Sequence, residues 1–132
     1  MITYEADVEG VDAEALVEFY EGWPAPPSPP QRLAVLEGSS HVVLAFDGDR
    51  LVGFVTAVSD GVLSAFIPLL EVLPDHRGKG IGSELVRRML GLLEGLYSID
   101  LVCDDDLVPF YERFGLRRGT AMTRRDREAF GR

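Results

Sequence analysis

One run of the chain joins an apolar strand pattern to a glycine-dense turn and then to an amphipathic helix, and it constrains the fold more than any other stretch. The run covers residues 70–83 and reads Leu-Glu-Val-Leu-Pro-Asp-His-Arg-Gly-Lys-Gly-Ile-Gly-Ser. Glycines at positions 78, 80 and 82 let the backbone approach a bulky anion, and the N–H groups of the first helical turn face it with the positive end of the helix dipole behind them. Arg77 and Lys79 add positive charge. The run therefore predicts a phosphate-binding loop.

The spacing of this loop separates it from two other phosphate-binding loops. A dinucleotide fingerprint starting at Gly78 would need glycine at position 83, where Ser83 stands. A Walker loop would need serine or threonine after Gly78-Lys79, where Gly80 stands. A tight turn with capping glycines and no ligand is the alternative that the residues alone leave open.

Length and composition indicate one domain spanning residues 1–132. A chain of 132 residues, of which 46% are hydrophobic, can bury a core without disulfides or metal ions. The single cysteine excludes an internal disulfide, and the first residues lack the pattern of a signal peptide. No apolar run is long enough for a membrane span. We expect a cytoplasmic protein without a membrane partner. The net charge of −9 disfavours nucleic acid and attracts cations such as amines.

Hydrophobic periodicity and turn residues predict six strands, at 2–8, 41–46, 50–58, 62–72, 97–103 and 116–123, and helices at 12–22, 31–37, 81–96 and 104–115. Tight turns make the strands between residues 41 and 72 an antiparallel meander. The helix at 81–96 then crosses over, so that the fifth strand runs parallel to the fourth. The proline-rich residues 23–30 form a stiff loop. Pro68 inside a central strand predicts a bulge or a parting of strands.

Two motifs resemble the GNAT superfamily of acyl-CoA-dependent N-acetyltransferases, and together they cover residues 69–116. The first is Arg-x-x-Gly-x-Gly, beginning at Arg77, after the strand pattern Leu-x-Val-x-Pro that begins at Leu70. The second is Phe-Tyr-Glu-Arg-Phe-Gly-Leu at residues 110–116. The resemblance implies an α/β fold whose mixed, mostly antiparallel sheet has about six to seven strands, is splayed at the fourth and fifth strands, and is flanked by about four helices.

The resemblance also implies acetyl-CoA as co-substrate. No metal is expected, because neither the histidines nor the cysteine have metal-ligand spacing. The pantetheine arm would bind backbone groups of a splayed strand, by the physics of strand addition, and the pyrophosphate would rest on the amides of the glycine loop. Asp104 stands where many family members have an asparagine that binds cofactor. The predicted cofactor-binding residues are Leu70, Val72, Arg77, Gly78, Lys79, Gly80, Ile81, Gly82 and Ser83.

Tyr111 matches the family tyrosine that protonates the leaving thiolate, a role suited to a phenol. From the helix pattern alone, packing in the apolar face is the alternative. Glu71 is the candidate base for the amine proton, because burial in an apolar strand would raise its pKa; an exposed sheet face or a water as base is the alternative. Asp60, His41 and Asp104 are weaker candidates for the base. Trp23 is the candidate substrate contact, with core packing as the equal alternative.

The function predicted from these residues is transfer of an acetyl group from acetyl-CoA directly to an amine of a small molecule or peptide. A catalytically silent acyl-CoA-binding sensor of the same fold is the alternative. His76 is interpreted as a surface residue of the loop, and Cys103 as a buried free thiol. The sequence leaves the oligomeric state open, with a homodimer as one option.

Overall fold

The computed structural model describes residues 1–131, and the strands of this part form one five-stranded sheet in the order β1-β2-β3-β4-β5. The pairs from β1 to β4 are antiparallel, and β4 and β5 are parallel. The mixed α/β class is therefore confirmed. The strands are β1 (Ile2–Glu5), β2 (His41–Asp47), β3 (Arg50–Ser59), β4 (Ser64–Val72) and β5 (Ser98–Asp100), and the α-helices are α1 (Pro29–Gly38), α2 (Ile81–Leu92) and α3 (Val108–Glu112).

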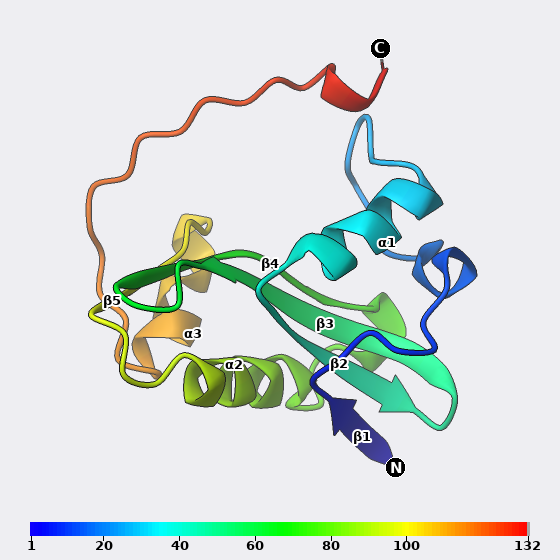
Figure 1. Cartoon of the computed structure of the whole chain (residues 1–132), viewed down its shortest axis with the longest axis horizontal. Coiled ribbons are helices and arrows are strands. Elements are labelled where there is room, and N and C mark those ends of the chain that lie inside the picture. The colour runs from blue at the N-terminus through cyan, green and yellow to red at the C-terminus, as the bar shows by residue number, and fades with distance from the viewer. Residues whose placement is uncertain (132) are drawn as a thin grey trace.

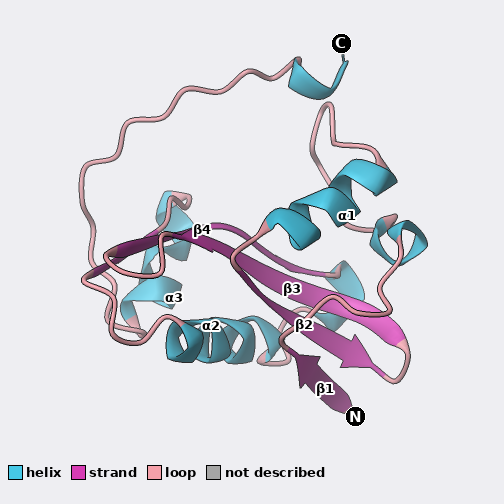
Figure 2. Cartoon of the chain, in the orientation of Figure 1, coloured by secondary structure: helices cyan, strands magenta, loops and turns pink. Residues whose placement is uncertain are grey.

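Four short 3₁₀ helices complete the described elements: η1 (Ala13–Leu16), η2 (Pro74–His76), η3 (Asp105–Leu107) and η4 (Ala129–Gly131). Figure 1 shows α2 under one face of the sheet and α1 with η1 over the other, which makes three layers. Figure 2 shows the long loop that follows α3 and runs clear of these layers.

The central strand β3 contacts both outer layers, which explains why seven consecutive residues in it are buried. Gly53 faces α2, and a Cβ placed there would lie 3.2 Å from the Leu85 side chain and 3.1 Å from the Glu71 carbonyl oxygen. Phe54 points the other way, with its ring centroid 5.1 Å from that of Phe19. The core therefore has two halves that meet at β3.

Two predictions about the meander are confirmed. The β2–β3 hairpin turns at Gly48, with Asp47 paired to Arg50. The register between β3 and β4 shifts between Phe66 and Leu69, so that Ile67 and Pro68 together lie opposite one residue of β3. Because proline has no N–H for the ladder, the bulge falls at Pro68 as expected.

The number of elements differs from the prediction: the described residues form five strands and three α-helices rather than six to seven strands and about four helices. The strand predicted at 116–123 is absent, since this segment is extended and unpaired. Helix α1 begins at Pro29, two residues before the predicted start. Ser28 and Gln31 form a capping box, and prolines fit the first turn, where no N–H is needed.

The helix predicted at 12–22 is reduced to the single turn η1. Asp12 caps it as expected, accepting from the Ala15 N–H. The Arg32 guanidinium points into the protein, where it donates to the carbonyl oxygens of Leu16, Val17 and Phe19, at 2.9, 3.1 and 3.2 Å. Because these carbonyls bind a side chain from α1, the chain leaves the helical path after η1.

Candidate active site

The edge of β4 that faces β5 is paired along its first part and open along the rest. Ser64, Ala65 and Phe66 pair with β5, and no described residue pairs with β4 on that side beyond Phe66. The Leu73 N–H donates to the Val52 carbonyl at 2.8 Å. Since backbone groups alternate along an antiparallel ladder, Leu70 and Val72 direct their N–H and C=O groups away from β3, into the gap. The splayed fourth and fifth strands are thus confirmed.

The glycine loop places an uncapped helix N-terminus beside this gap. Gly80 is the N-cap of α2 at φ 84°, and Gly78 has φ 76°, a region that favours glycine. No side chain caps α2. The N–H groups of Ile81, Gly82 and Ser83, which have no partner within a helix, are therefore free to bind an anion.

Two predicted cations flank the loop. Arg77 donates from Nε to the Val72 carbonyl at 3.0 Å and lies 3.8 Å from the Glu21 carboxylate, so its guanidinium closes the end of the open edge. Lys79 is exposed between the two left-handed glycines. Both positions leave positive charge near the free N–H groups of α2.

Helix α3 borders the same loop through Phe110 and Arg113. A Cβ at Gly82 would meet the Phe110 ring at 3.9 Å, and Arg113 donates to the Ser83 hydroxyl at 2.8 Å. The Arg113 guanidinium is held over the rings of Phe110 and Phe114. Arg113 is a cation at the α2 N-terminus that sequence reasoning missed, although it lies two residues after the tyrosine of the second motif.

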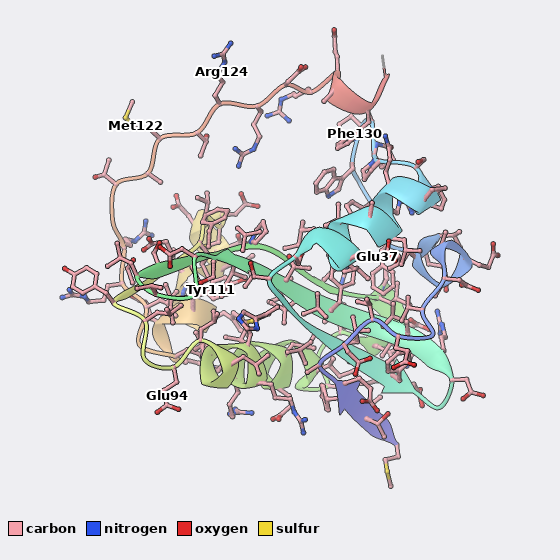
Figure 3. The ribbon with its side chains drawn as sticks, viewed as in Figure 1. Glu37, Glu94, Tyr111, Met122, Arg124 and Phe130 are labelled. Atoms are coloured by element: carbon pink, nitrogen blue, oxygen red, sulfur yellow. The ribbon has the colours of Figure 1, made fainter. Side chains whose placement is uncertain are left out.

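Tyr111 follows Phe110 in α3 and lies partly buried beside Cys103 (Figure 3). Burial, with a smaller contribution from the nearby Cys103 thiol, raises the pKa of the Tyr111 phenol. The phenol therefore keeps its proton at neutral pH. Glu71 lies on β4 and Tyr111 on α3, and no hydrogen bond among those of residues 1–131 joins them.

Glu71 is half-buried on the face of β4 that η1 covers, rather than on an exposed sheet face. Its Oε1 accepts from the Tyr20 N–H at 2.9 Å, and its Oε2 is enclosed without a hydrogen-bond partner among the described residues. Burial raises the pKa of Glu71, while the Tyr20 N–H and the positive charges of Arg32 and Arg77 oppose the rise. The carboxyl group is thus a stronger base than one in water.

The segment that covers Glu71, residues 17–27, is held in an unusual conformation by Arg32. Tyr20 has φ 67°, a left-handed conformation that costs a tyrosine roughly 1 kcal/mol. The buried Arg32 donates to four carbonyls of residues 16–27 and lies 5.0 Å from the centroid of the Tyr20 ring.

Trp23 is 44% exposed, with its ring edge-on to Tyr20. Burial raises the pKa of Tyr20 to about 12.

His76 is buried, so the interpretation of it as a surface residue is wrong. Its Nε2 lies 2.9 Å from the Asp47 carboxylate and its Nδ1 lies 3.0 Å from the Asp75 carboxylate. Asp75 also accepts from Arg50, which donates in turn to Glu18. This network, Asp47-His76-Asp75-Arg50-Glu18, joins the β2–β3 hairpin, the start of the glycine loop and the segment after η1.

The weaker candidates have other surroundings. The Asp60 carboxylate accepts hydrogen bonds from the N–H groups of residues 62–64. These hydrogen bonds cap a turn and lower the pKa of Asp60. His41 is half-buried at the start of β2, and Asp104 is exposed before η3. Cys103 is a free thiol of intermediate burial rather than a buried one.

This arrangement of a splayed sheet, a glycine loop and a tyrosine helix can be compared with known proteins. Residues 8–116 match the Acetyltransferase (GNAT) family. The chain belongs to the GNAT acetyltransferase family. A GNAT family protein of Streptococcus pneumoniae is 31% identical in sequence, covers 96% of this chain and all of its own, and superposes with a TM-score of 0.76.

Other relatives agree with the GNAT assignment. A Deinococcus radiodurans R1 crystal structure, provisionally named an acetyltransferase, is 49% identical with a TM-score of 0.93, covering 96% of this chain and 90% of that one. The soybean histone acetyltransferase TAP1 is 28% identical over 83% of this chain and 52% of its own length. The chain spans about half the length of TAP1 and of the soybean probable acetyltransferase TAP2.

Two features are absent from residues 1–131 of this GNAT domain. Every helix there is too short or too polar to cross a bilayer. No group of three or more His, Cys, Asp or Glu side chains in that part of the chain is arranged to hold a metal ion.

Proposed function

We propose that the chain transfers an acetyl group from acetyl-CoA directly to an amine of a small molecule or peptide. The observation that carries the proposal is the open edge of β4, with Leu70 and Val72 directed into the gap, next to the uncapped N-terminus of α2. One extended ligand with amides at one end and phosphates at the other fits this pair of features.

The residues at the loop fit the phosphate end of acetyl-CoA. A Cβ at Gly78 or Gly80 would meet nothing within 4 Å, so the space beside the loop is open. The free N–H groups of Ile81 to Ser83 and the positive charges of Arg77, Lys79 and Arg113 suit a diphosphate. The remaining predicted contacts, from Leu70 and Val72, would bind the pantetheine amides as an added strand does.

Acetyl-CoA supplies a thioester carbonyl, whose C–S bond breaks as the C–N bond to the amine forms. A backbone N–H of the open edge near Val72 would donate to the developing oxyanion. Tyr111 would give its proton to the departing sulfur, and its raised pKa keeps that proton in place until then.

Glu71 would take the proton of the acceptor amine, and burial increases its basicity. Because Oε2 is enclosed, the proton reaches it through an ordered water or after residues 17–27 move. Trp23, exposed beside Tyr20, would contact the acceptor. The acidic net charge favours the approach of a cationic amine.

The test combines acetyl-CoA titration with a screen of amines for thiol release, using Tyr111→Phe and, as a matched control, Tyr97→Phe, whose phenol is 86% exposed. We expect Tyr111→Phe to lower kcat by about 100-fold or more with an unchanged Kd for acetyl-CoA, because general acid catalysis contributes about 10²–10⁴-fold. Tyr97→Phe should behave like the native chain. Tight binding with no thiol release across a broad panel would instead indicate the silent sensor.

A further inference from the structure

The side chain of His76 attaches the start of the glycine loop to the rest of the protein. Residues 77–80 form neither helix nor strand and are exposed, and a Cβ at Gly78 or Gly80 would meet nothing within 4 Å. Within residues 74–80, His76 alone has a buried side chain, which is 7% exposed. The position of the loop therefore depends strongly on what the His76 ring contacts.

The His76 ring joins the loop to two strands through charged groups. Its Nε2 lies 2.9 Å from the carboxylate of Asp47, the last residue of β2, and its Nδ1 lies 3.0 Å from the Asp75 carboxylate. Asp75 is paired with Arg50 of β3 at 3.0 Å, and Arg50 with Glu18 at 3.2 Å. The ring can donate to both carboxylates only as an imidazolium, because that form alone has two N–H groups.

Loss of one proton from the ring removes one of these two hydrogen bonds. A neutral imidazole has a single N–H, so its other nitrogen would face a carboxylate with no proton between them. Asp75 is adjacent to His76 in sequence, whereas Asp47 is 29 residues away and lies at the end of the β2–β3 hairpin. A ring that moves away from Asp47 therefore moves the start of the loop away from the hairpin.

The charged groups around His76 keep its proton in place near neutral pH. Asp47 on β2 and Asp75 on η2 raise the pKa of His76 above its ordinary value of 6.5, while burial and the charge of Lys79 lower it. The N-terminal ammonium lies 3.9 Å from Asp47, and Arg50 is paired with Asp75. Both of these cations contact a carboxylate rather than the ring. The proton is therefore lost in mildly alkaline rather than mildly acid solution.

We propose that His76 is a positioning residue for the glycine loop, and that loss of its ring proton releases the loop from the β2–β3 hairpin and weakens the binding of a diphosphate. This inference rests on the proposed function, because the diphosphate is that of acetyl-CoA. Loss of the proton also leaves more negative charge beside the free N–H groups of α2, which opposes an anion. By reciprocity, a diphosphate that binds the charged form better must favour uptake of that proton.

The test measures the pH dependence of ligand binding with dephospho-CoA as the probe. This molecule keeps the pantetheine arm and the diphosphate but lacks the 3′-phosphate, a group whose own proton dissociates near pH ~6. Titration calorimetry gives the Kd from mildly acid to mildly alkaline buffer, and buffers of different ionisation enthalpy give the number of protons taken up. We expect the Kd to rise by about fivefold or more with pH, which is the lower end of typical coupling between sites.

Three variants separate His76 from other groups that titrate in this range. His76→Gln should bind weakly at every pH and take up no proton, although it keeps the N-terminal amine. Asp47→Asn should move the loss of affinity to lower pH, because the hydrogen bond with Asp47 is the largest cause of the raised pKa of His76. His41→Gln changes the other of the two histidines, at the opposite end of β2 from Asp47, and should behave like the native chain.

Two results would overturn the proposal while leaving acetyl transfer intact: a Kd of the native chain that does not change with pH, or a pH dependence that His76→Gln retains. No binding of dephospho-CoA at any pH would instead contradict the proposed function and this inference with it. Hydrogen exchange without ligand gives a separate readout. In mildly acid buffer we expect residues 77–83 to exchange faster in His76→Gln than in the native chain, and equal rates would show that the ring does not hold the loop.

Discussion

Arg32 shows how one side chain can decide the conformation of a whole segment. It is buried, and its guanidinium donates to the carbonyls of Pro27, Leu16, Val17 and Phe19. Those bonds replace helix bonds and hold Tyr20 where its N–H reaches Glu71. Arg32 is therefore a positioning residue for the acceptor side of the proposed site, and it touches neither the glycine loop nor the open edge of β4.

We expect Arg32→Lys to raise the KM for the acceptor amine by about tenfold or more, while the Kd for acetyl-CoA stays unchanged. Lysine keeps the charge but lacks the planar fork that reaches several carbonyls at once. A lost bond to a charged donor is worth about 1.5–3 kcal/mol, and 1.4 kcal/mol corresponds to tenfold. Steady-state kinetics and a separate acetyl-CoA titration measure the two quantities. An equal loss in both would indicate general destabilisation rather than positioning.

Residue identity alone allowed some site residues to be predicted and not others. Glu71 stands out because a carboxylate is unusual in an apolar strand, and Tyr111 because it matches a family motif. Arg32, Arg113 and His76 gave no such signal. Their roles depend on partners 5 to 30 residues away in sequence, which only the tertiary structure brings together.

At the scale of elements, the close packing of α2 against β3 fixes where the glycine loop lies. Gly53 allows the approach, since a Cβ there would come within 3.1–3.2 Å of the Glu71 carbonyl and Leu85. We expect Gly53→Ala to lower the free energy of unfolding by about 1–3 kcal/mol through overpacking. Gly91→Ala in α2, where nothing lies within 4 Å of the added Cβ, should instead raise the free energy of unfolding by about 0.5–1 kcal/mol. Urea unfolding measures both, and equal effects would contradict this account of the packing.

The network around His76 links the glycine loop to the β2–β3 hairpin in a pH-dependent way. Both ring nitrogens face carboxylates, and this arrangement favours the imidazolium form, in which each nitrogen can donate. The Asp47 and Asp75 hydrogen bonds raise the pKa of His76, while burial and, to a smaller extent, the charge of Lys79 lower it. The two carboxylates that face the ring each contact a second cation. Asp75 is paired with Arg50, and Asp47 with the N-terminal ammonium. The pKa of Asp75 falls to about 2, so this carboxylate stays charged near neutral pH.

A raised folded-state pKa means that the stabilisation from His76 is complete below its ordinary value of 6.5 and is lost as the pH rises through the raised value. We expect the difference in Tm between the native chain and His76→Gln to be largest in mildly acid buffer and to shrink in mildly alkaline buffer. Thermal unfolding followed by circular dichroism across that range measures it. A difference that does not change with pH would show that the ring is neutral.

The elements that were predicted correctly are those with strong local signals. The hairpin at Gly48, the bulge at Pro68 and the start of α2 at Ile81 each follow from turn residues or from a proline. The helix expected at 12–22 failed because Arg32 competes for its carbonyls. The strand expected at 116–123 failed because the chain that follows α3 stays extended and unpaired. A local sequence pattern shows neither a distant side chain that competes for carbonyls nor the path that the chain takes after a helix.

At the scale of the whole molecule, the fold brings three separate segments to one gap. β4 supplies an open edge, α2 supplies free N–H groups, and α3 supplies Tyr111 and Arg113. The order of these segments could be predicted from the motifs at residues 69–116. Their meeting at a parted pair of strands was implied by the family resemblance and is present in the structure.

A crystal structure of this chain with bound CoA tests the central claim most directly. The account predicts the diphosphate within hydrogen-bond distance of the N–H groups of Ile81, Gly82 and Ser83, and the pantetheine arm bonded to the backbone of Leu70 and Val72 between β4 and β5. CoA bound elsewhere, with those backbone groups paired to protein and the β4–β5 gap closed, would contradict it.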